Sequence, residues 1–200
     1  MKYLLIDSAT ATLVVAIVID DKIAYYYNQK VGKDMSSSIM SVIDEAFKTV
    51  GIKPRELDKI FIANGPGSFT GIRVGLTVAK TMAWALNIPV ISISSLEVIA
   101  STPSNQNNIA VIDARRGYVY AGVYDVNLNS IMSDQHILFN DINQQGTVVS
   151  YDSYGEIKPN IDILKVIKKH INDEAVNPHS LKPKYLKLTE AEEKLHKFHD

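Results

Sequence analysis

The sequence predicts an α/β protein of two lobes, the second smaller than the first. Apolar, β-branched runs typical of buried strands alternate with segments of helical period in the first hundred residues. A polar stretch with a proline at 101–108 then separates this part from a second group of strands. We therefore expect a first lobe over residues 1–103 and a smaller second lobe over residues 104–200.

The first three predicted elements are strands joined by short turns. Residues 3–7 form a short apolar run, and residues 12–19 (TLVVAIVI) are almost continuously apolar, which suits a strand covered on both faces. Asp20 and Asp21 indicate a turn, and residues 22–29 follow with three consecutive tyrosines. A meander is the simplest arrangement for three strands connected in this way.

A helical period begins after these strands. Asp34 stands where an N-cap is expected and Gly51 where the helix would end. Pro54 then opens a single predicted helical turn, and residues 59–63 (KIFIA) predict another buried strand. Within the helix, apolar side chains recur at intervals of three and four and form one stripe: Met35, Ile39, Val42, Ile43, Ala46, Phe47 and Val50.

A glycine-rich turn at residues 65–71 (GPGSFTG) precedes the second long helix. Its three glycines permit positive φ angles or close approach of two backbones, and such a turn before a helix could hold an anion. The turn lacks the Gly-Lys-Ser/Thr ending of a P-loop, the third glycine of G-x-G-x-x-G and the glycine spacing of a nucleophile elbow. A structural turn is therefore favoured over phosphate binding or hydrolysis.

The helix predicted over residues 72–86 is apolar on nearly its whole circumference, which predicts burial on nearly all sides. One face can pack on the sheet of its own lobe. We expect the other face to be free for a second helix, with packing under the second lobe as the alternative. This face carries small and apolar side chains: Gly71, Gly75, Val78, Ala79 and Met82.

The remaining elements are less regular. Ser94 opens a short helix after a strand at residues 89–93, and Glu97 stands at capping-box spacing from it. A second lobe that also begins with two consecutive strands could be a diverged repeat, a degenerate echo, of the first lobe. Further strands are expected at 109–113, 118–126, 131–139 and 147–151, and helices at 161–171 and 189–197, the last with Thr189 and Glu192 spaced as a cap.

The turn that follows the first strand of the second lobe carries Asp113, Arg115 and Arg116. These residues could contact an anion or tRNA. We favour a charged turn between the lobes, in which arginine pairs with a local carboxylate.

Composition limits the function classes. The 21 Lys and Arg against 22 Asp and Glu argue against a strong nucleic-acid binder acting alone. The sequence has no cysteine, which excludes disulfides, thiolate nucleophiles and Cys-ligated metals. The apolar run before Asp7 is too short for a signal peptide, and no run approaches the roughly 18–20 residues of a membrane span. We expect a cytoplasmic protein with no membrane partner.

Several motifs resemble a known family. The order of three strands, helix, strand, helix and strand resembles the ribonuclease H-like unit of actin, hexokinase and sugar kinases, which makes a two-lobed actin/hexokinase-like fold with a reduced second lobe the expected class. The run GPGSFTGIRVGLTVAKTMAWAL is similar to the signature of the TsaB/YeaZ family. Residues 6–10 (IDSAT), 111–120 (VIDARRGYVY) and 184–186 (KYL) resemble three further elements of that family, and the match is ordered through residues 1–125.

The resemblance implies a non-catalytic partner subunit in the biosynthesis of tRNA threonylcarbamoyladenosine. Its catalytic paralogue TsaD transfers threonylcarbamoyl to the adenosine beside the anticodon. The implied partners are TsaD through helices 34–50 and 70–86, the ATPase TsaE, a second copy of the chain when alone, and tRNA only through the complex. The implied interface residues are Met35, Ser36, Ile39, Met40, Gly71, Val74, Gly75, Val78, Ala79 and Met82.

Two departures from the catalytic relatives predict that the chain has no catalytic residue, cofactor or metal. TsaD carries a His-x-x-x-His pair on the helix that corresponds to residues 34–50, where this chain has no histidine. Ala9 stands where actin-like ATPases have the glycine of their phosphate turn, and Asp7 is favoured as a turn cap over a Mg²⁺ ligand. The histidines lie elsewhere, at His136, His170, His179, His196 and His199.

Two alternatives remain open from the sequence. One is an ATP- or metal-dependent enzyme of the same superfamily, either a kinase or a peptidase. The other is a homodimeric regulatory module with no role in tRNA modification.

Overall fold

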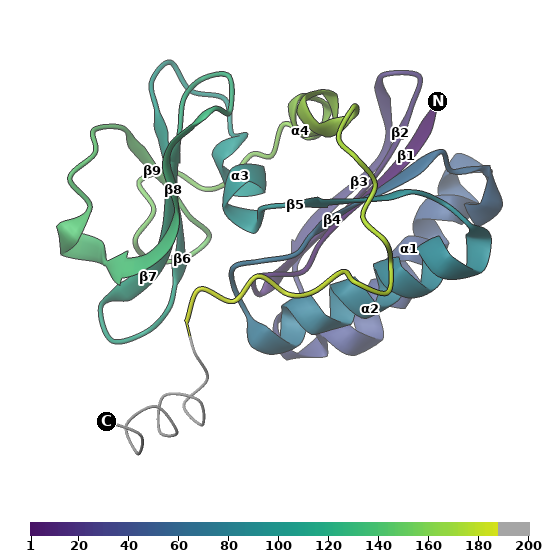
Figure 1. Cartoon of the computed structure of the whole chain (residues 1–200), viewed down its shortest axis with the longest axis horizontal. Helices are drawn as coiled ribbons and strands as arrows, with labels where there is room; N and C mark the ends of the chain where they lie inside the picture. The colour runs from purple at the N-terminus through teal and green to yellow at the C-terminus, as the bar shows by residue number, and fades with distance from the viewer. Residues whose placement is uncertain (188–200) are drawn as a thin grey trace.

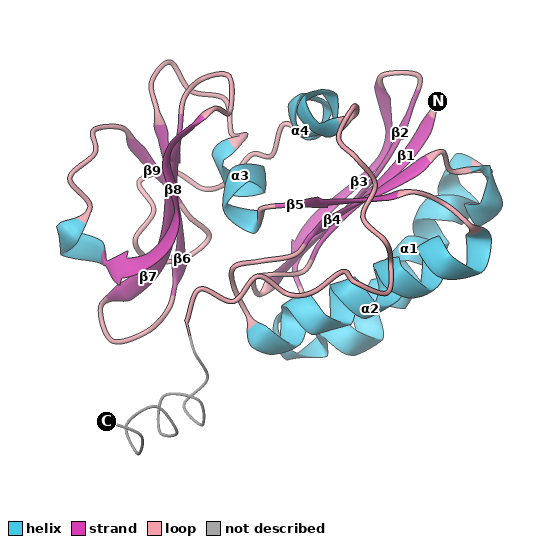
Figure 2. Cartoon of the chain, in the orientation of Figure 1, coloured by secondary structure: helices cyan, strands magenta, loops and turns pink. Residues whose placement is uncertain are grey.

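The computed structural model describes residues 1–187, so the helix expected at 189–197, His196 and His199 lie outside the described residues. Two β-sheets with helices packed around the first make up this part of the chain (Figure 1). The first sheet begins with three consecutive strands, after which helices and strands alternate, while the second sheet is built almost entirely of strands (Figure 2). Within residues 1–187, no helix has both the length and the apolar character needed to cross a membrane.

The first sheet has five strands in the order β3-β2-β1-β4-β5. The first three form antiparallel pairs, which confirms the predicted meander, whereas β4 is parallel to β1 and β5 is parallel to β4. Nearly every residue of β1, β2 and β4 is buried, as their continuous apolar sequences require. The strands are β1 (Lys2–Asp7), β2 (Thr12–Ile19), β3 (Lys22–Lys30), β4 (Lys59–Ala63) and β5 (Val90–Ile93).

Helices cover both faces of this sheet. On one face, α1 (Met35–Val50) and α2 (Phe69–Leu86) lie side by side and bury their apolar stripes in one core (Figure 1). On the other face, α3 (Ser95–Ala100) and α4 (Ile163–His170) close a second core, which continues into the second sheet. Short 3₁₀ turns lie at Gly32–Asp34, Pro54–Glu56 and Phe139–Asp141, the second of them as predicted.

The second sheet repeats the plan of the first. Its order is β8-β7-β6-β9, with antiparallel pairs from β8 to β6 and a parallel pair between β6 and β9. This is the arrangement of β3-β2-β1-β4, so the predicted echo of the first lobe is confirmed. The strands are β6 (Asn108–Asp113), β7 (Tyr118–Tyr124), β8 (Ser130–Leu138) and β9 (Thr147–Val149).

The chain returns to the first lobe at α4 and continues along that lobe. Val176 forms an isolated bridge with Val90 on β5, and Leu181 is buried in the core beneath α2. Figure 1 shows this yellow segment running along α2 and then toward the second sheet. Residues 171–187 therefore pack on the first lobe, although sequence order placed them in the second. The division of the chain at residue 103 stays a prediction.

The starts of α1 and α2 differ from the predictions in their capping hydrogen bonds. The Asp34 side chain makes no capping bond, since this residue ends a 3₁₀ turn, whereas Gly51 closes α1 with φ +75° as expected. α2 begins at Phe69 instead of Ile72, because the Ser68 hydroxyl accepts a hydrogen bond from the Gly71 amide at 3.2 Å.

The capping box predicted at α3 is only half formed. Ser94 Oγ caps the helix, but the Glu97 carboxylate turns instead to Lys169 and His170 on α4. In the second lobe, β7 ends at Tyr124, β9 ends at Val149 and α4 covers only Ile163–His170, each shorter than expected.

Candidate functional site

The glycine-rich turn is clamped to the turn between β1 and β2. The Ser68 amide donates to the Ala9 carbonyl at 2.6 Å, and a Cβ on Gly67, where φ is +150°, would lie 2.2 Å from that carbonyl oxygen. A Cβ on Gly71 would lie 2.2 Å from the Ser8 carbonyl oxygen. The glycines therefore serve close packing of two backbones inside this chain.

This packing corrects one expectation about α2. Gly71, Gly75 and Ala79 are buried, and the two glycines lie directly against Ser8 of the β1–β2 turn. The prediction that these small residues lie on the free face of the helix is wrong. Glycines allow close approach of a helix to its neighbour, and α2 uses this side to pack on its own lobe. Apolar and polar side chains on the α1 side of α2 remain accessible instead.

An apolar groove of about 410 Å³ lies between α1 and α2. Met40 at its rim is 52% exposed and Phe69 is 42% exposed, while Val74 and Val78 are half-buried. Exposed apolar surface of this kind often marks a protein contact. The groove is lined by Ser36, Ile39, Met40, Phe69, Thr70, Arg73, Val74, Thr77 and Val78.

The other predicted interface residues lie around this groove. Met82 is half-buried on the same helix, one turn beyond Val78. Met35 is buried at the start of α1, and its side chain borders the cleft between the lobes.

The segment at residues 171–187 packs against one end of the groove through Tyr185. Tyr185 stacks on Phe69 with 5.0 Å between ring centroids, and its hydroxyl accepts a hydrogen bond from Arg73 Nε at 2.8 Å. The Arg73 guanidinium lies 3.7 Å from the Phe69 ring centre. Lys184 forms an ion pair with Asp134 on β8 at 2.8 Å. Sequence reasoning missed the contacts of Tyr185 and Lys184, because they join residues 50 or more positions apart and leave no local pattern.

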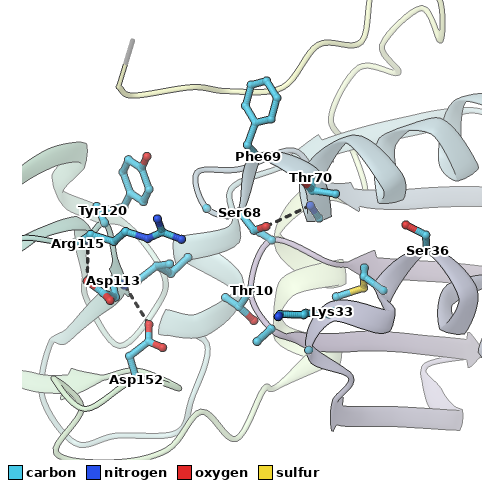
Figure 3. A pocket seen from close by; sticks show the side chains of 18 residues that line it. Thr10, Lys33, Ser36, Ser68, Phe69, Thr70, Asp113, Arg115, Tyr120 and Asp152 are labelled. Atoms are coloured by element: carbon cyan, nitrogen blue, oxygen red, sulfur yellow. Dashed lines mark hydrogen bonds between the residues drawn. The ribbon is translucent and has the colours of Figure 1, made fainter. Parts of the chain in front are cut away.

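A cleft of about 810 Å³ separates the two lobes next to the glycine-rich turn (Figure 3). The first lobe contributes Thr10, Lys33 and the start of α2. The second lobe contributes Arg115 and Tyr120, and Figure 3 shows Arg115 extending toward Ser68. The first-lobe wall of the cleft therefore carries the cation Lys33, and the second-lobe wall carries Arg115 together with the acids Asp113 and Asp152.

Asp7 at the end of β1 is a turn cap. Its Oδ1 accepts the Ala9 amide at 2.8 Å, it is buried, and it does not line the cleft. Burial raises the pKa of Asp7 to about 7, with the Ala9 hydrogen bond acting in the opposite direction. The hydrogen bond to the Ala9 amide and the position of Asp7 outside the cleft lining favour the turn-cap interpretation over a metal-phosphate site.

We expect Asp7→Asn to stabilise the chain more at pH 8 than at pH 5. Because the folded pKa of about 7 is above the ordinary value of 3.8, the stability that the Asp7 proton contributes is full below pH 3.8 and is lost as pH rises through 7. Asparagine keeps the oxygen that accepts the Ala9 amide but does not titrate. The free energy of unfolding should therefore rise at pH 8 by an amount on the order of 4 kcal/mol at most. Thermal melts of both proteins across this range measure the effect. A pH-independent difference in melting temperature would contradict it.

The arginines in the turn between β6 and β7 do not form the ion pair with a local carboxylate that was expected. The Asp113 carboxylate accepts the Arg115 amide at 2.8 Å, and no ion pair within residues 1–187 involves Arg115 or Arg116. The expectation that arginine pairs with a local carboxylate is wrong, because the nearby acid is used to hold the backbone of the turn.

The described histidines make structural contacts. His170 lies between Glu97 and Asp173, at 2.9 and 2.6 Å. His136 stacks on Tyr118, and His179 lies edge-on to Trp84. In the part of the chain that the structure describes, no three His, Cys, Asp or Glu side chains converge in a way suited to a metal ion.

Comparison with known proteins places these features in a family. The family model described as "TsaD: tRNA N6-adenosine threonylcarbamoyltransferase" matches residues 26–170. The tRNA threonylcarbamoyladenosine biosynthesis protein TsaB of Bacillus subtilis (strain 168) is 31% identical, over 97% of this chain and 97% of that protein. The protein of the same name from Escherichia coli (strain K12) is 30% identical, over 66% of this chain and 58% of its own length.

Solved structures agree with the fold. YeaZ from Pseudomonas aeruginosa superposes with a TM-score of 0.80 at 20% identity, over 92% of this chain and 99% of that one. A protein described as similar to the peptidase YeaZ from Pseudomonas aeruginosa gives a TM-score of 0.81 at 19% identity, over 93% and 99% of the two chains. The predicted actin/hexokinase-like α/β class is confirmed.

Proposed function

The chain belongs to the TsaB/YeaZ family of tRNA threonylcarbamoyladenosine biosynthesis, and from this premise we propose that it is the non-catalytic partner of a TsaD-type catalytic subunit. The observation that carries the proposal is the apolar groove between α1 and α2, with Met40 52% exposed at its rim. An exposed methionine in an apolar groove is stabilised when a second apolar surface covers it.

The family match supports a partner of the TsaD type. Because residues 26–170 match the TsaD model, a TsaD-type partner would present two helices equivalent to α1 and α2. Two such pairs can pack about a pseudo-twofold axis, each helix pair covering the groove of the other. The same geometry would let two copies of this chain pair when the partner is absent.

The proposed contact residues are those of the predicted set that reach the groove or its edge. Gly71, Gly75 and Ala79 would support α2 from beneath, because they are buried against the β1–β2 turn and the sheet. Met35 would position the start of α1 in the same indirect way. The direct contacts would be Ser36, Met40, Val74, Val78 and Met82, and Ile39, which is buried, would form part of the groove floor beneath them.

Two features support a non-catalytic role. Helix α1 has no histidine, so it lacks the pair that the catalytic relatives use for metal. Ala9 is fully buried, and its amide already bonds to Asp7, so the first turn offers no open phosphate cradle at this position. We further propose that TsaE binds the assembled pair, that tRNA is reached through the complex, and that the complex works in the cytoplasm.

The test is transfer of threonylcarbamoyl to tRNA by a purified TsaD-type subunit with and without this chain. A second candidate, an ATP- or metal-dependent enzyme, is favoured only by the cleft of about 810 Å³ between the lobes. Titration of the isolated chain with Mg·ATP separates the two, because micromolar affinity would favour the enzyme.

A further inference from the structure

The turn between β6 and β7 holds two arginines in a backbone conformation that arginine seldom adopts. The φ angles are +69° at Arg115, +58° at Arg116 and +78° at Gly117. Asparagine and glycine normally occupy such positions in tight turns, because a larger side chain is disfavoured there. Two consecutive arginines at these positions point to a role for their guanidinium groups.

The backbone of this turn is fixed by hydrogen bonds. Asp113 Oδ1 accepts the Arg115 amide at 2.8 Å, Asp152 Oδ2 accepts the Asp113 amide at 2.9 Å, and the Gly117 carbonyl accepts the Phe139 amide at 3.0 Å. Both carboxylates are thus bonded to backbone amides, and no ion pair in residues 1–187 reaches either guanidinium. The turn presents two exposed positive charges on a rigid base.

An aromatic surface continues from this turn to the cleft. Tyr118 and Tyr120 lie on one face of β7, and His136 lies opposite Tyr120 on β8. The Tyr118 and His136 rings stack with 4.8 Å between centroids at 9°, and Tyr120 lies 5.5 Å from the same imidazole. Tyr118 is 40% exposed, so one ring in this row is open to a further aromatic group.

We propose that this turn and its aromatic surface form a contact for single-stranded RNA. The Arg115 and Arg116 guanidiniums would bind phosphodiester oxygens, and an unpaired base would stack on Tyr118. Exposed aromatic rings beside arginines that make no ion pair within residues 1–187 suit unpaired RNA, because its bases can stack on the rings while its phosphates bind the guanidinium groups. The inference rests on the proposed function, in which the RNA is the tRNA bound by the complex.

The test is a titration of labelled tRNA with Arg115→Asn/Arg116→Asn and with the unchanged protein. Asparagine tolerates positive φ, so the turn keeps its shape while two charges are removed. We expect affinity to fall about tenfold at low salt and the slope of log K against log salt to fall by about 1.4, the value for two single-strand phosphate contacts. Tyr118→Leu should weaken binding about tenfold, and Tyr118→Phe should retain it.

The matched control is Lys53→Asn/Arg55→Asn. It removes the same charge from an exposed turn before β4, at the opposite end of that strand from the cleft. If Arg115→Asn/Arg116→Asn leaves affinity and salt slope at the values of this control, the proposal is overturned. Loss of catalytic-subunit binding at unchanged RNA affinity would also overturn it, by assigning the turn to a protein contact.

Titrations use both the chain alone and its complex with the catalytic subunit. If the unchanged chain fails to assemble or to support modification, that result counts against the proposed function alone. The salt slopes of each form that binds tRNA, the complex or the isolated chain, decide whether the arginines contact RNA, and an absence of tRNA binding by both forms would overturn the proposal.

Discussion

Met40→Glu is expected to abolish association with the TsaD-type partner while leaving this chain folded. Met40 is 52% exposed in the isolated chain, so a carboxylate at this position stays solvated. In the complex the new carboxylate would be buried without an opposite charge, which would weaken binding by about 3–5 kcal/mol. Since 1.4 kcal/mol is a factor of ten, the dissociation constant should rise at least about a hundredfold. Calorimetric titration with the catalytic subunit measures this change.

Ile131→Glu is the control for that experiment. Ile131 is also 52% exposed, but it lies on β8 in the second sheet, away from the groove. Binding should be normal for this variant. Val78→Glu should abolish association as well, although half-buried Val78 also packs on the core, so part of its effect will be on folding. If Met40→Glu and Ile131→Glu bind equally well, the interface is placed wrongly.

Gly67→Ala should destabilise the chain more than any other glycine replacement proposed here. The new methyl would lie 2.2 Å from the Ala9 carbonyl oxygen and 2.9 Å from the Ala9 side chain. The neighbouring Ser68 amide bonds to the same carbonyl at 2.6 Å, so the two turns cannot separate without breaking that bond. We expect a loss of about 3–5 kcal/mol in the free energy of unfolding, measured by urea denaturation.

Gly51→Ala separates backbone strain from the clash. Gly51 has φ +75°, but a Cβ there would meet no atom within 4 Å. Its replacement should therefore cost only the conformational penalty of roughly 1–2 kcal/mol. If Gly67→Ala costs no more than Gly51→Ala, the glycine-rich turn is not held by close packing against the β1–β2 turn.

The strands were predictable because their signal is local. The continuous apolar run of β2 and the KIFIA sequence of β4 indicated buried strands, and the structure buries both. Gly51 likewise marked the end of α1 at the correct residue. The start of α2 was misplaced, because Ser68 had been assigned to the glycine-rich turn and its capping role was overlooked.

The orientation of α2 could not be read from its sequence. A helix that is apolar on nearly all sides has no periodicity to say which side meets its own sheet. The contact of Gly75 with Ser8 settles this, and it joins segments far apart in the chain. The bond from Arg73 to Tyr185, 112 residues away, is another long-range contact of that kind.

Reconstituted transfer of threonylcarbamoyl to tRNA tests the central claim most directly. A purified TsaD-type subunit is supplied with threonylcarbamoyl-AMP and tRNA, with and without this chain, and the modified adenosine is measured by mass spectrometry. We expect this chain to form a complex with that subunit, and transfer to require both. Full transfer by the catalytic subunit alone, or transfer by this chain alone, would contradict it.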